Sequence, residues 1–375
     1  MSEIWLEGRW LSEGGWQEGP LGLTQGCVGD PGAAARRIDA RGKLILPGLI
    51  DLHGDAFERH IAPRRGAMNS TENGLRATEA ELAANGITTA VLAQFWSWEG
   101  GLRSPETAKR ILAGLSQAAP QLDTDMRLQL RLETHFLDTL DEVLALIDTH
   151  RIGYVAFNDH LPHERLEQGR KPPRLTGTAL KSGRSPEAHL ALMHQLHQRS
   201  NEVPAAMEAF CAKLQARGIL IASHDDGTAE DRQIWRARGA TLSEFPETRA
   251  AALEAKDHGE GVIMGAPNVV RGASHKGNVS ARELVLDGLV DALASDYHYP
   301  SMRQALVELD RPLEDLWPLV SSGPARLLGL TDRGALASGK RADLVVLDAQ
   351  THHLELTMSG GAITYARGEM ARRLL

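Results

Sequence analysis

The 375-residue sequence predicts an α/β protein in which a TIM-like (β/α)8 barrel carries a small β-sandwich formed by both ends of the chain. Eight apolar runs of strand length alternate with stretches of helical periodicity, and short strand-like runs broken by Gly and Pro occupy both ends. Five of the eight runs end at a His beside a carboxylate. We place the sandwich at residues 1–46 plus 335–375 and the barrel at residues 47–334.

The two ends of the chain predict the sandwich. Strand-like runs at Ile4–Leu6 and Arg9–Leu11 are separated by Gly-containing turns, and similar runs recur at Ala342–Leu347, His353–Leu356 and Ala362–Ala366. Because the termini of a domain often lie close together, we expect these runs to pair.

Between the ends, repeated βα units predict a parallel barrel. A count of eight favours a closed barrel over an open doubly wound sheet. The longest helical stretch, Glu187–Arg217, has room for two helices, and residues 163–185, rich in Pro, Gly and basic side chains, are expected to form a mobile lid. The predicted barrel strands are Leu44–Ile50, Ile87–Ala93, Arg127–Leu132, Ile152–Phe157, Ile219–Ser223, Thr241–Phe245, Val262–Ala266 and Val290–Ser295.

Composition restricts the partners. The net charge is −8 and basic residues form no block, which argues against a nucleic-acid partner and favours a small-molecule substrate. Neither a leader pattern nor an apolar run of about 20 residues is present, so we expect a cytoplasmic protein with no membrane partner. Cys27 and Cys211 are the only cysteines, so a metal ion must be held by His and carboxylate side chains. A homo-oligomer is left open.

The strand ends predict the metal site, because barrel enzymes place their chemistry at the carboxyl ends of the strands. His53 and Asp55 are two apart in an extended chain, so both can address one ion. Each histidine alone is more often an ordinary loop residue, but the set suits one or two divalent ions, with zinc expected and manganese or iron as alternatives. The predicted metal ligands are His53, Asp55, Glu133 (bridging), His160, His224 and Asp296.

Asp296 is also the predicted catalytic residue. A bound metal lowers the pKa of its water to ~7, and a neighbouring carboxylate can accept the proton and return it to the leaving group. Other histidines, among them His163 and His197, are interpreted as ordinary surface residues of helices.

Two basic loops, residues 52–67 and 267–278, predict a small anionic substrate, because Arg and Lys side chains can hold phosphate or phosphonate oxygens. The alternative is that these cations simply pair with carboxylates around the barrel. Trp96 and Trp98 either line the pocket or pack in the core. The predicted substrate-binding residues are Arg59, Arg64, Arg65, Arg271, His275, Lys276 and His298.

Two segments carry a resemblance to a known family. LPGLIDLHGD at the first strand and GKRADLVVLD near the C-terminus resemble the amidohydrolase superfamily, which combines a metal-bearing (β/α)8 barrel with a small sandwich. HGDAFERHIAPRRGA, the NDH at residues 158–160 and MGAPNVVRGASHKGN are similar to the superfamily's diphosphatases of phosphonate metabolism, which act on alpha-D-ribose 1-methylphosphonate 5-triphosphate.

The resemblance implies a binuclear site at which a metal-activated hydroxide attacks the α-phosphorus and releases pyrophosphate, leaving the 5-phosphate, with Asp296 as acid/base. It also implies two ligand histidines on strands five and six, whereas His160 and His224 follow the predicted strands four and five. Gly54, Ala56 and the HYPSMR stretch at residues 298–303 depart from the pattern. Hydrolysis of a carbon–nitrogen bond in an amide, cyclic amide or amine therefore stays as the alternative, and a metal-binding barrel without catalysis is the third.

Overall fold

The computed structural model describes residues 3–64, 70–272 and 278–375. Two compact units make up the chain. The first comprises Met1–Leu92, Gln117–Arg127 and Ile263–Leu375, and the second comprises Ala93–Ser116 and Leu128–Val262. No helix among the described residues is both long and apolar enough to cross a membrane. The predicted boundaries at residues 46 and 335 stay a prediction.

The predicted barrel is confirmed, with eight strands in one sheet that follow the order of the chain. An isolated parallel bridge between Gly54 and Asp296 joins the first strand to the last. Most strands are buried along their whole length, which is typical of parallel strands covered on both faces. The strands are β5 (Leu49–Gly54), β6 (Ile87–Trp96), β7 (Asp125–Glu133), β8 (Tyr154–Asn158), β9 (Leu220–His224), β10 (Leu242–Glu244), β11 (Gly261–Gly265) and β12 (Ala292–Ala294).

The predicted bounds of the first barrel strand, Leu44–Ile50, were wrong. Its first half belongs to β4 (Arg36–Pro47), which pairs antiparallel with β13 (Leu344–Asp348) in the other sheet. The barrel strand β5 begins at Leu49, after Gly48. A Cβ atom on Gly48 would lie 2.4 Å from Oγ1 of Thr88, so the chain crosses between the sheets where only glycine fits.

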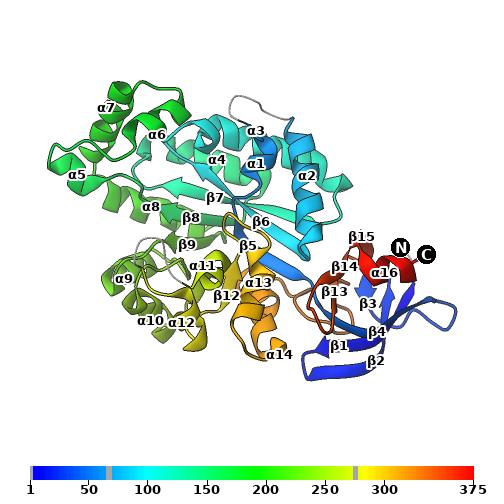
Figure 1. Ribbon diagram of the computed structural model, residues 1–375. Helices are drawn as coiled ribbons and strands as arrows, with labels where there is room; N and C mark the ends of the chain where they lie inside the picture. The colour runs from blue at the N-terminus through cyan, green and yellow to red at the C-terminus, as the bar shows by residue number, and fades with distance from the viewer. Residues whose placement is uncertain (1–2, 65–69, 273–277) are drawn as a thin grey trace. The chain divides into compact units, whose positions relative to one another are not determined.

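The two ends of the chain form one seven-stranded sheet in the order β15-β14-β13-β4-β1-β2-β3. Its remaining strands are β1 (Ile4–Ser12), β2 (Gly15–Thr24), β3 (Cys27–Val28), β14 (Leu354–Ser359) and β15 (Ala362–Ala366). Leu6, Ile38, Val346 and Leu356 belong to one buried cluster, and Figure 1 shows the two termini side by side. Burial of these apolar side chains holds the ends together.

Helices follow the strands in both units, and N-cap side chains mark where several of them begin. Ser70 accepts a hydrogen bond from the Asn73 amide at the start of α2, and Thr228 and Asp231 form a capping box at the start of α9.

The first unit contains α1 (Glu58–Ile61), α2 (Thr71–Ala84), α11 (Ala266–Arg271), α12 (Ala281–Leu286), α13 (Ser301–Glu308), α14 (Leu313–Leu316), α15 (Ser322–Leu327) and α16 (Gly368–Arg373). The helices after β6 to β10 are α3 (Pro105–Ala118), α4 (Leu140–His150), α5 (His163–Glu167), α6 (Leu175–Ser182), α7 (Pro186–His197), α8 (Val203–Gln215), α9 (Ala229–Ala237) and α10 (Arg249–Asp257).

The long stretch between β8 and β9 contains four helices, α5 to α8, drawn in green in Figure 1. The stretch Glu187–Arg217, which is long enough for two helices or for an elaboration, forms two helices with the break after His197. Leu161, Leu166, Leu175, Met193 and Leu196 form a buried cluster. This cluster packs α5, α6 and α7 into a small layer of their own.

Candidate active site

In the first unit, β5 ends at the predicted ligand pair. The His53 side chain is buried, with 0% of its surface exposed. The Asp296 amide donates to the His53 carbonyl, and the Asp55 amide donates to the Asp296 carbonyl, both at 2.9 Å. The backbone therefore places the predicted acid/base next to the His53–Asp55 pair.

Gly54, which departs from the family pattern, is required by its surroundings. A Cβ atom at this position would lie 2.7 Å from Oδ2 of Asp51 and 2.9 Å from Oγ of Ser295. Asp51 is fully buried, accepts hydrogen bonds from the Ser295 hydroxyl and the Ser295 and His53 amides, and its burial raises its pKa. The buried Asp51 carboxyl group occupies the space between β5 and β12 that a larger side chain at position 54 would need.

In the second unit, the ends of β7 and β8 bring Glu133 and His160 together. Nδ1 of His160 contacts Oε1 of Glu133, and the His160 amide donates to Oε2 at 3.1 Å. Burial acts to lower the pKa of His160, but the Glu133 carboxylate outweighs it and raises the pKa. Glu99, which was not predicted from the sequence, offers a third ligand atom. The ligand atoms of Glu99, Glu133 and His160 all lie within 4.8 Å of one another.

A second group in the same unit surrounds His224. Nη2 of Arg131 lies 2.9 Å from Oδ1 of Asn158 and 2.9 Å from Nε2 of His224. The guanidinium is buried and lies 4.0 Å from the centroid of the Phe95 ring. Arg131 therefore brings a permanent positive charge to this end of the barrel strands, which sequence reasoning missed.

Glu244, at the end of β10, is the other missed residue. It pairs in register with His224 across the two parallel strands, and their ligand atoms lie within 4.8 Å. Oε1 of Glu244 accepts hydrogen bonds from Nε2 of Gln129 at 2.6 Å and from the Tyr154 hydroxyl. Burial, aided by Glu244, raises the pKa of Tyr154, so the phenol stays a proton donor to this carboxylate. Glu244 could have been predicted from the sequence, because it lies at the end of a predicted barrel strand.

Three strands end in the same backbone conformation. Asp225, Phe245 and Asp296 follow the ends of β9, β10 and β12, and each has a positive φ, at 62°, 54° and 54°. The left-handed region is tolerated by Asp better than by bulky side chains such as Phe. These turns redirect the chain at the carboxyl ends of three barrel strands, the end at which barrel enzymes place their chemistry.

The predicted substrate-binding cations occupy different surroundings. Arg59 pairs with Glu81 and donates to the Tyr297 carbonyl at 3.3 Å. Arg271 donates to Oδ1 of Asn268 at 3.2 Å. Arg64 and His298 are exposed. Arg65, His275 and Lys276 lie outside the described residues.

The two tryptophans after β6 are both buried. Nε1 of Trp96 donates to Oγ1 of Thr139 at 2.9 Å, which assigns it to packing. Nε1 of Trp98 lies 3.3 Å from Oε2 of Glu133, so Trp98 orients a predicted metal ligand.

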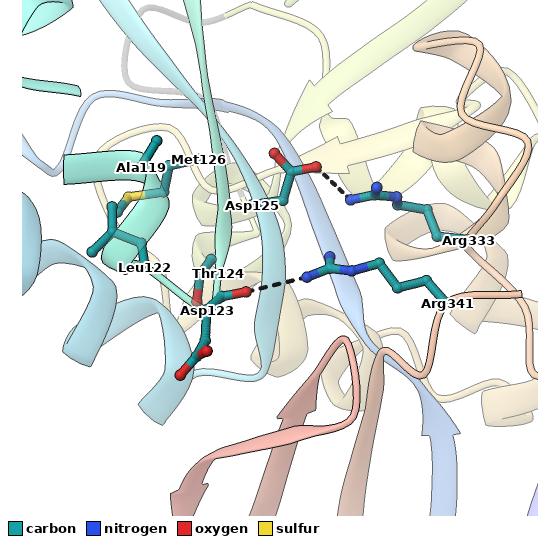
Figure 2. A pocket seen from close by; sticks show the side chains of 8 residues that line it. All are labelled: Ala119, Leu122, Asp123, Thr124, Asp125, Met126, Arg333 and Arg341. Carbon is teal, nitrogen blue, oxygen red and sulfur yellow. Dashed lines mark hydrogen bonds and ion pairs between the residues drawn. The ribbon is translucent and has the colours of Figure 1, made fainter. Parts of the chain in front are cut away.

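A cavity of about 320 Å3 in the first unit lies at the amino-terminal end of β7, far along the strand from Glu133. Figure 2 shows Arg333 reaching Asp125 and Arg341 reaching the backbone of Asp123. The two arginines at its wall already have protein partners, and barrel chemistry belongs to the opposite strand ends. We therefore do not assign the cavity to the active site.

The donor atoms at the carboxyl ends fit a divalent metal ion. They are imidazole nitrogens and carboxylate oxygens, the ligands that zinc, manganese and iron accept in proteins. Glu133 is 1% exposed, and a buried carboxylate needs a cationic partner, a role that a bound divalent ion would fill.

Comparisons with known proteins agree with this fold. The profile of the amidohydrolase family matches residues 174–365. Alpha-D-ribose 1-methylphosphonate 5-triphosphate diphosphatase of Escherichia coli (strain K12) is 34% identical over 85% of this chain and 87% of its own. An imidazolonepropionase of Salinispora arenicola is 26% identical over 92% of this chain and 91% of its own. A crystal structure of an atrazine chlorohydrolase variant from Arthrobacter aurescens, complexed with zinc and atraton, has a TM-score of 0.63 at 14% identity and covers 99% of this chain and 98% of its own.

A (β/α)8 barrel with His and carboxylate side chains at the ends of its strands is typical of metal-dependent hydrolases. The chain belongs to the amidohydrolase family and is a hydrolase of that superfamily.

Proposed function

We propose that this hydrolase splits alpha-D-ribose 1-methylphosphonate 5-triphosphate into the 5-phosphate and pyrophosphate. The observation that carries the proposal is the 34% identity to the Escherichia coli diphosphatase over 85% of the chain. Fold likeness alone would not select a substrate, because one barrel hosts many chemistries.

The proposed metal ligands are the strand-end residues of the barrel. In the first unit these are His53, Asp55 and Asp296, and in the second they are Glu133, His160 and His224. Their residue types and their places at the carboxyl ends of β5, β7, β8, β9 and β12 support the assignment. A bound divalent ion would lower the pKa of a water molecule to ~7 and offset charge on the phosphoryl oxygens.

Asp296 is the proposed proton carrier. Its carboxylate accepts a proton as the water oxygen forms a bond to the α-phosphorus, and the bond from that phosphorus to the bridging oxygen breaks. The same proton can then pass to the departing pyrophosphate oxygen, so water and the triphosphate are consumed and two products leave. The backbone contacts to His53 and Asp55 hold the main chain of Asp296 beside the proposed ligand pair.

A permanent cation at the strand ends supports an anionic substrate. Arg131 is buried and has a charge that proton loss cannot remove at neutral pH. Developing negative charge on phosphoryl oxygens is stabilised most where such a cation is already held in place.

Carbon–nitrogen hydrolysis is the second candidate. The imidazolonepropionase relative covers 92% of the chain, and Arg59, one of the expected phosphate-binding cations, is paired with Glu81. A pocket in which few cations face the substrate would suit a neutral amide or cyclic amide.

The test is a product assay on protein loaded with zinc, and separately with manganese. The triphosphate is followed by phosphorus NMR for pyrophosphate, beside amides, cyclic amides and aminopurines followed for ring opening or ammonia. Water labelled with oxygen-18 should place the label in the 5-phosphate, because attack is at the α-phosphorus. Pyrophosphate release that a chelator abolishes supports the proposal, whereas carbon–nitrogen turnover without pyrophosphate refutes it.

A further inference from the structure

A cluster of His and Asp side chains outside the proposed ligand set lies within the second unit. His135 is two residues beyond β7, Asp159 directly follows β8, and His163 is the first residue of α5. Their ligand atoms all lie within 4.8 Å of one another. We call these three residues the His135 cluster.

The spacing of the donors in the His135 cluster matches the coordination shell of a small metal ion. Nε2 of His163 lies 3.0 Å from Oδ2 of Asp159, and Nδ1 of His135 lies 3.5 Å from the same carboxylate oxygen. Zinc binds N and O ligands at about 2.0–2.2 Å, so ligands at neighbouring corners of its tetrahedron lie roughly 3.3–3.5 Å apart. The 3.5 Å separation agrees with this value, and the 3.0 Å separation is shorter by a few tenths of an ångström.

The second ring nitrogens of His135 and His163 contact residues of a different segment. Nδ1 of His163 lies 2.8 Å from Nδ1 of His197, at the end of α7. Nε2 of His135 lies 3.1 Å from Oγ of Ser200, and that hydroxyl donates to the His197 carbonyl at 2.6 Å. Histidines that bind metals usually donate the N–H of their second ring nitrogen to a fixed acceptor, which sets the tautomer.

Two sets of tautomers satisfy these contacts. In one, Nε2 of His163 donates to the Asp159 carboxylate, and in the other the nitrogens that face Asp159 carry no proton. The second set is the one that a bound cation would select. Because the Ser200 hydroxyl donates to the His197 carbonyl, its oxygen accepts the Nε2 proton of His135, and His163 can donate from Nδ1 to His197. Both nitrogens facing Asp159 then carry lone pairs, the form in which imidazole binds a metal ion. Two imidazole lone pairs and a carboxylate that converge in this way form a ligand set that zinc accepts.

We propose that the His135 cluster binds a divalent transition-metal ion, zinc by ligand preference, through Nδ1 of His135, the Asp159 carboxylate and Nε2 of His163. Water completes the shell, because the Asp159 and His163 side chains are 39% and 32% exposed. The ion joins α5, and through His197 and Ser200 the end of α7, to the ends of β7 and β8. It fastens the layer of α5 to α7 onto the barrel strands of the same unit.

Metal content tests the proposal independently of catalysis. Zinc-loaded protein, freed of loosely bound metal, is analysed by plasma mass spectrometry for the full chain and for His163→Ala and Asp159→Asn. The measurement is repeated in a Glu133→Gln/His160→Ala background, which perturbs the proposed catalytic ligands. His194→Ala, on α7 but outside the cluster, is the matched control. We expect each cluster variant to lose about one ion per chain in both backgrounds, and the control to lose none.

Cobalt provides the second readout. The cobalt-substituted Glu133→Gln/His160→Ala protein should show visible ligand-field absorption that is lost on adding His163→Ala or His135→Gln, while circular dichroism stays unchanged. Equal zinc content in the parent chain and in all folded cluster variants would overturn the proposal, as would a loss of metal that His194→Ala shares. Because neither readout uses turnover, failure of the proposed diphosphatase activity leaves this test unaffected.

Discussion

His53 and Asp296 are joined through the main chain, with the Asp296 amide donating to the His53 carbonyl at 2.9 Å. The ends of the first and last barrel strands therefore meet at the residues proposed for metal binding and proton transfer. Asp296 holds this position with a φ of 54°, in a region that Asp adopts more readily than most residues. The closure of the barrel and the position of the proposed acid/base residue depend on the same contact.

Replacing Asp296 by Asn should keep the backbone contact, because the amide side chain has the same size and tolerates the left-handed conformation. Turnover should fall by about two to four orders of magnitude, since the proton carrier is lost. Steady-state kinetics and metal analysis of the same preparation check this. Turnover equal to that of the parent protein would remove Asp296 from the mechanism.

Gly54→Ala should disturb the junction of β5 and β12. The new methyl group would lie 2.7 Å from the buried Asp51 carboxylate, and overpacking of this kind costs about 1–3 kcal/mol. Both the free energy of unfolding and metal affinity at His53 should fall. Gly153→Ala is the control, because no atom lies within 4 Å of its added methyl group. Equal denaturation midpoints for the two variants would contradict the explanation of Gly54.

Arg232→Ala should destabilise the second unit strongly. The side chain is 0% exposed, and it pairs with Glu260 at 2.7 Å and Asp226 at 3.2 Å. Removing one partner of a buried ion pair leaves uncompensated charge and costs about 3–5 kcal/mol. Urea denaturation followed by circular dichroism measures the change. Arg236→Ala, at a more exposed site beside the same Glu260, should cost clearly less, and the reverse order would refute the assignment.

Lys43 makes the stability of the terminal sheet dependent on pH. Its ammonium group is 3% exposed and lies 2.9 Å from Asp348, 3.2 Å from Glu355 and 3.0 Å from Glu369. The hydrogen bond from Lys43 is the largest of the interactions that lower the pKa of Asp348 and of Glu369. A lowered pKa adds stability above about pH 4, the unfolded value, and this stability is lost as the pH falls through the folded value.

Lys43→Met should therefore lower the midpoint of thermal unfolding at pH 7 by several degrees, and the difference should shrink as the pH falls below about 4. Differential scanning calorimetry across this range measures both effects. Lys340→Met is the control and should show little change at either pH, because the partly exposed ammonium group donates only to the Thr331 carbonyl among the described residues. A difference that stays constant with pH would show that lost packing, and not charge pairing, causes the destabilisation.

The order of the strands and the residue types at their ends followed from local patterns. Strand-length apolar runs separated by helical periodicity can be recognised without tertiary contacts, and parallel strands necessarily place their carboxyl ends alike. His53 and Asp296 were predicted to lie at strand ends and do so, and the predicted strand numbers of Glu133, His160 and His224 agree with the barrel. Arg131 could have been found as well, because it lies two residues before Glu133 in β7 and so shares a strand face with it.

The tertiary structure decided what depends on contacts between distant segments. The run beginning at Leu44 is apolar throughout, and only its pairing with β13 shows where one sheet ends and the other begins. Likewise, His163 and His197 look like ordinary helix residues until α5 and α7 pack together. Sequence periodicity determines which face of an element is apolar, whereas the neighbours of its polar residues depend on packing between elements far apart in the chain.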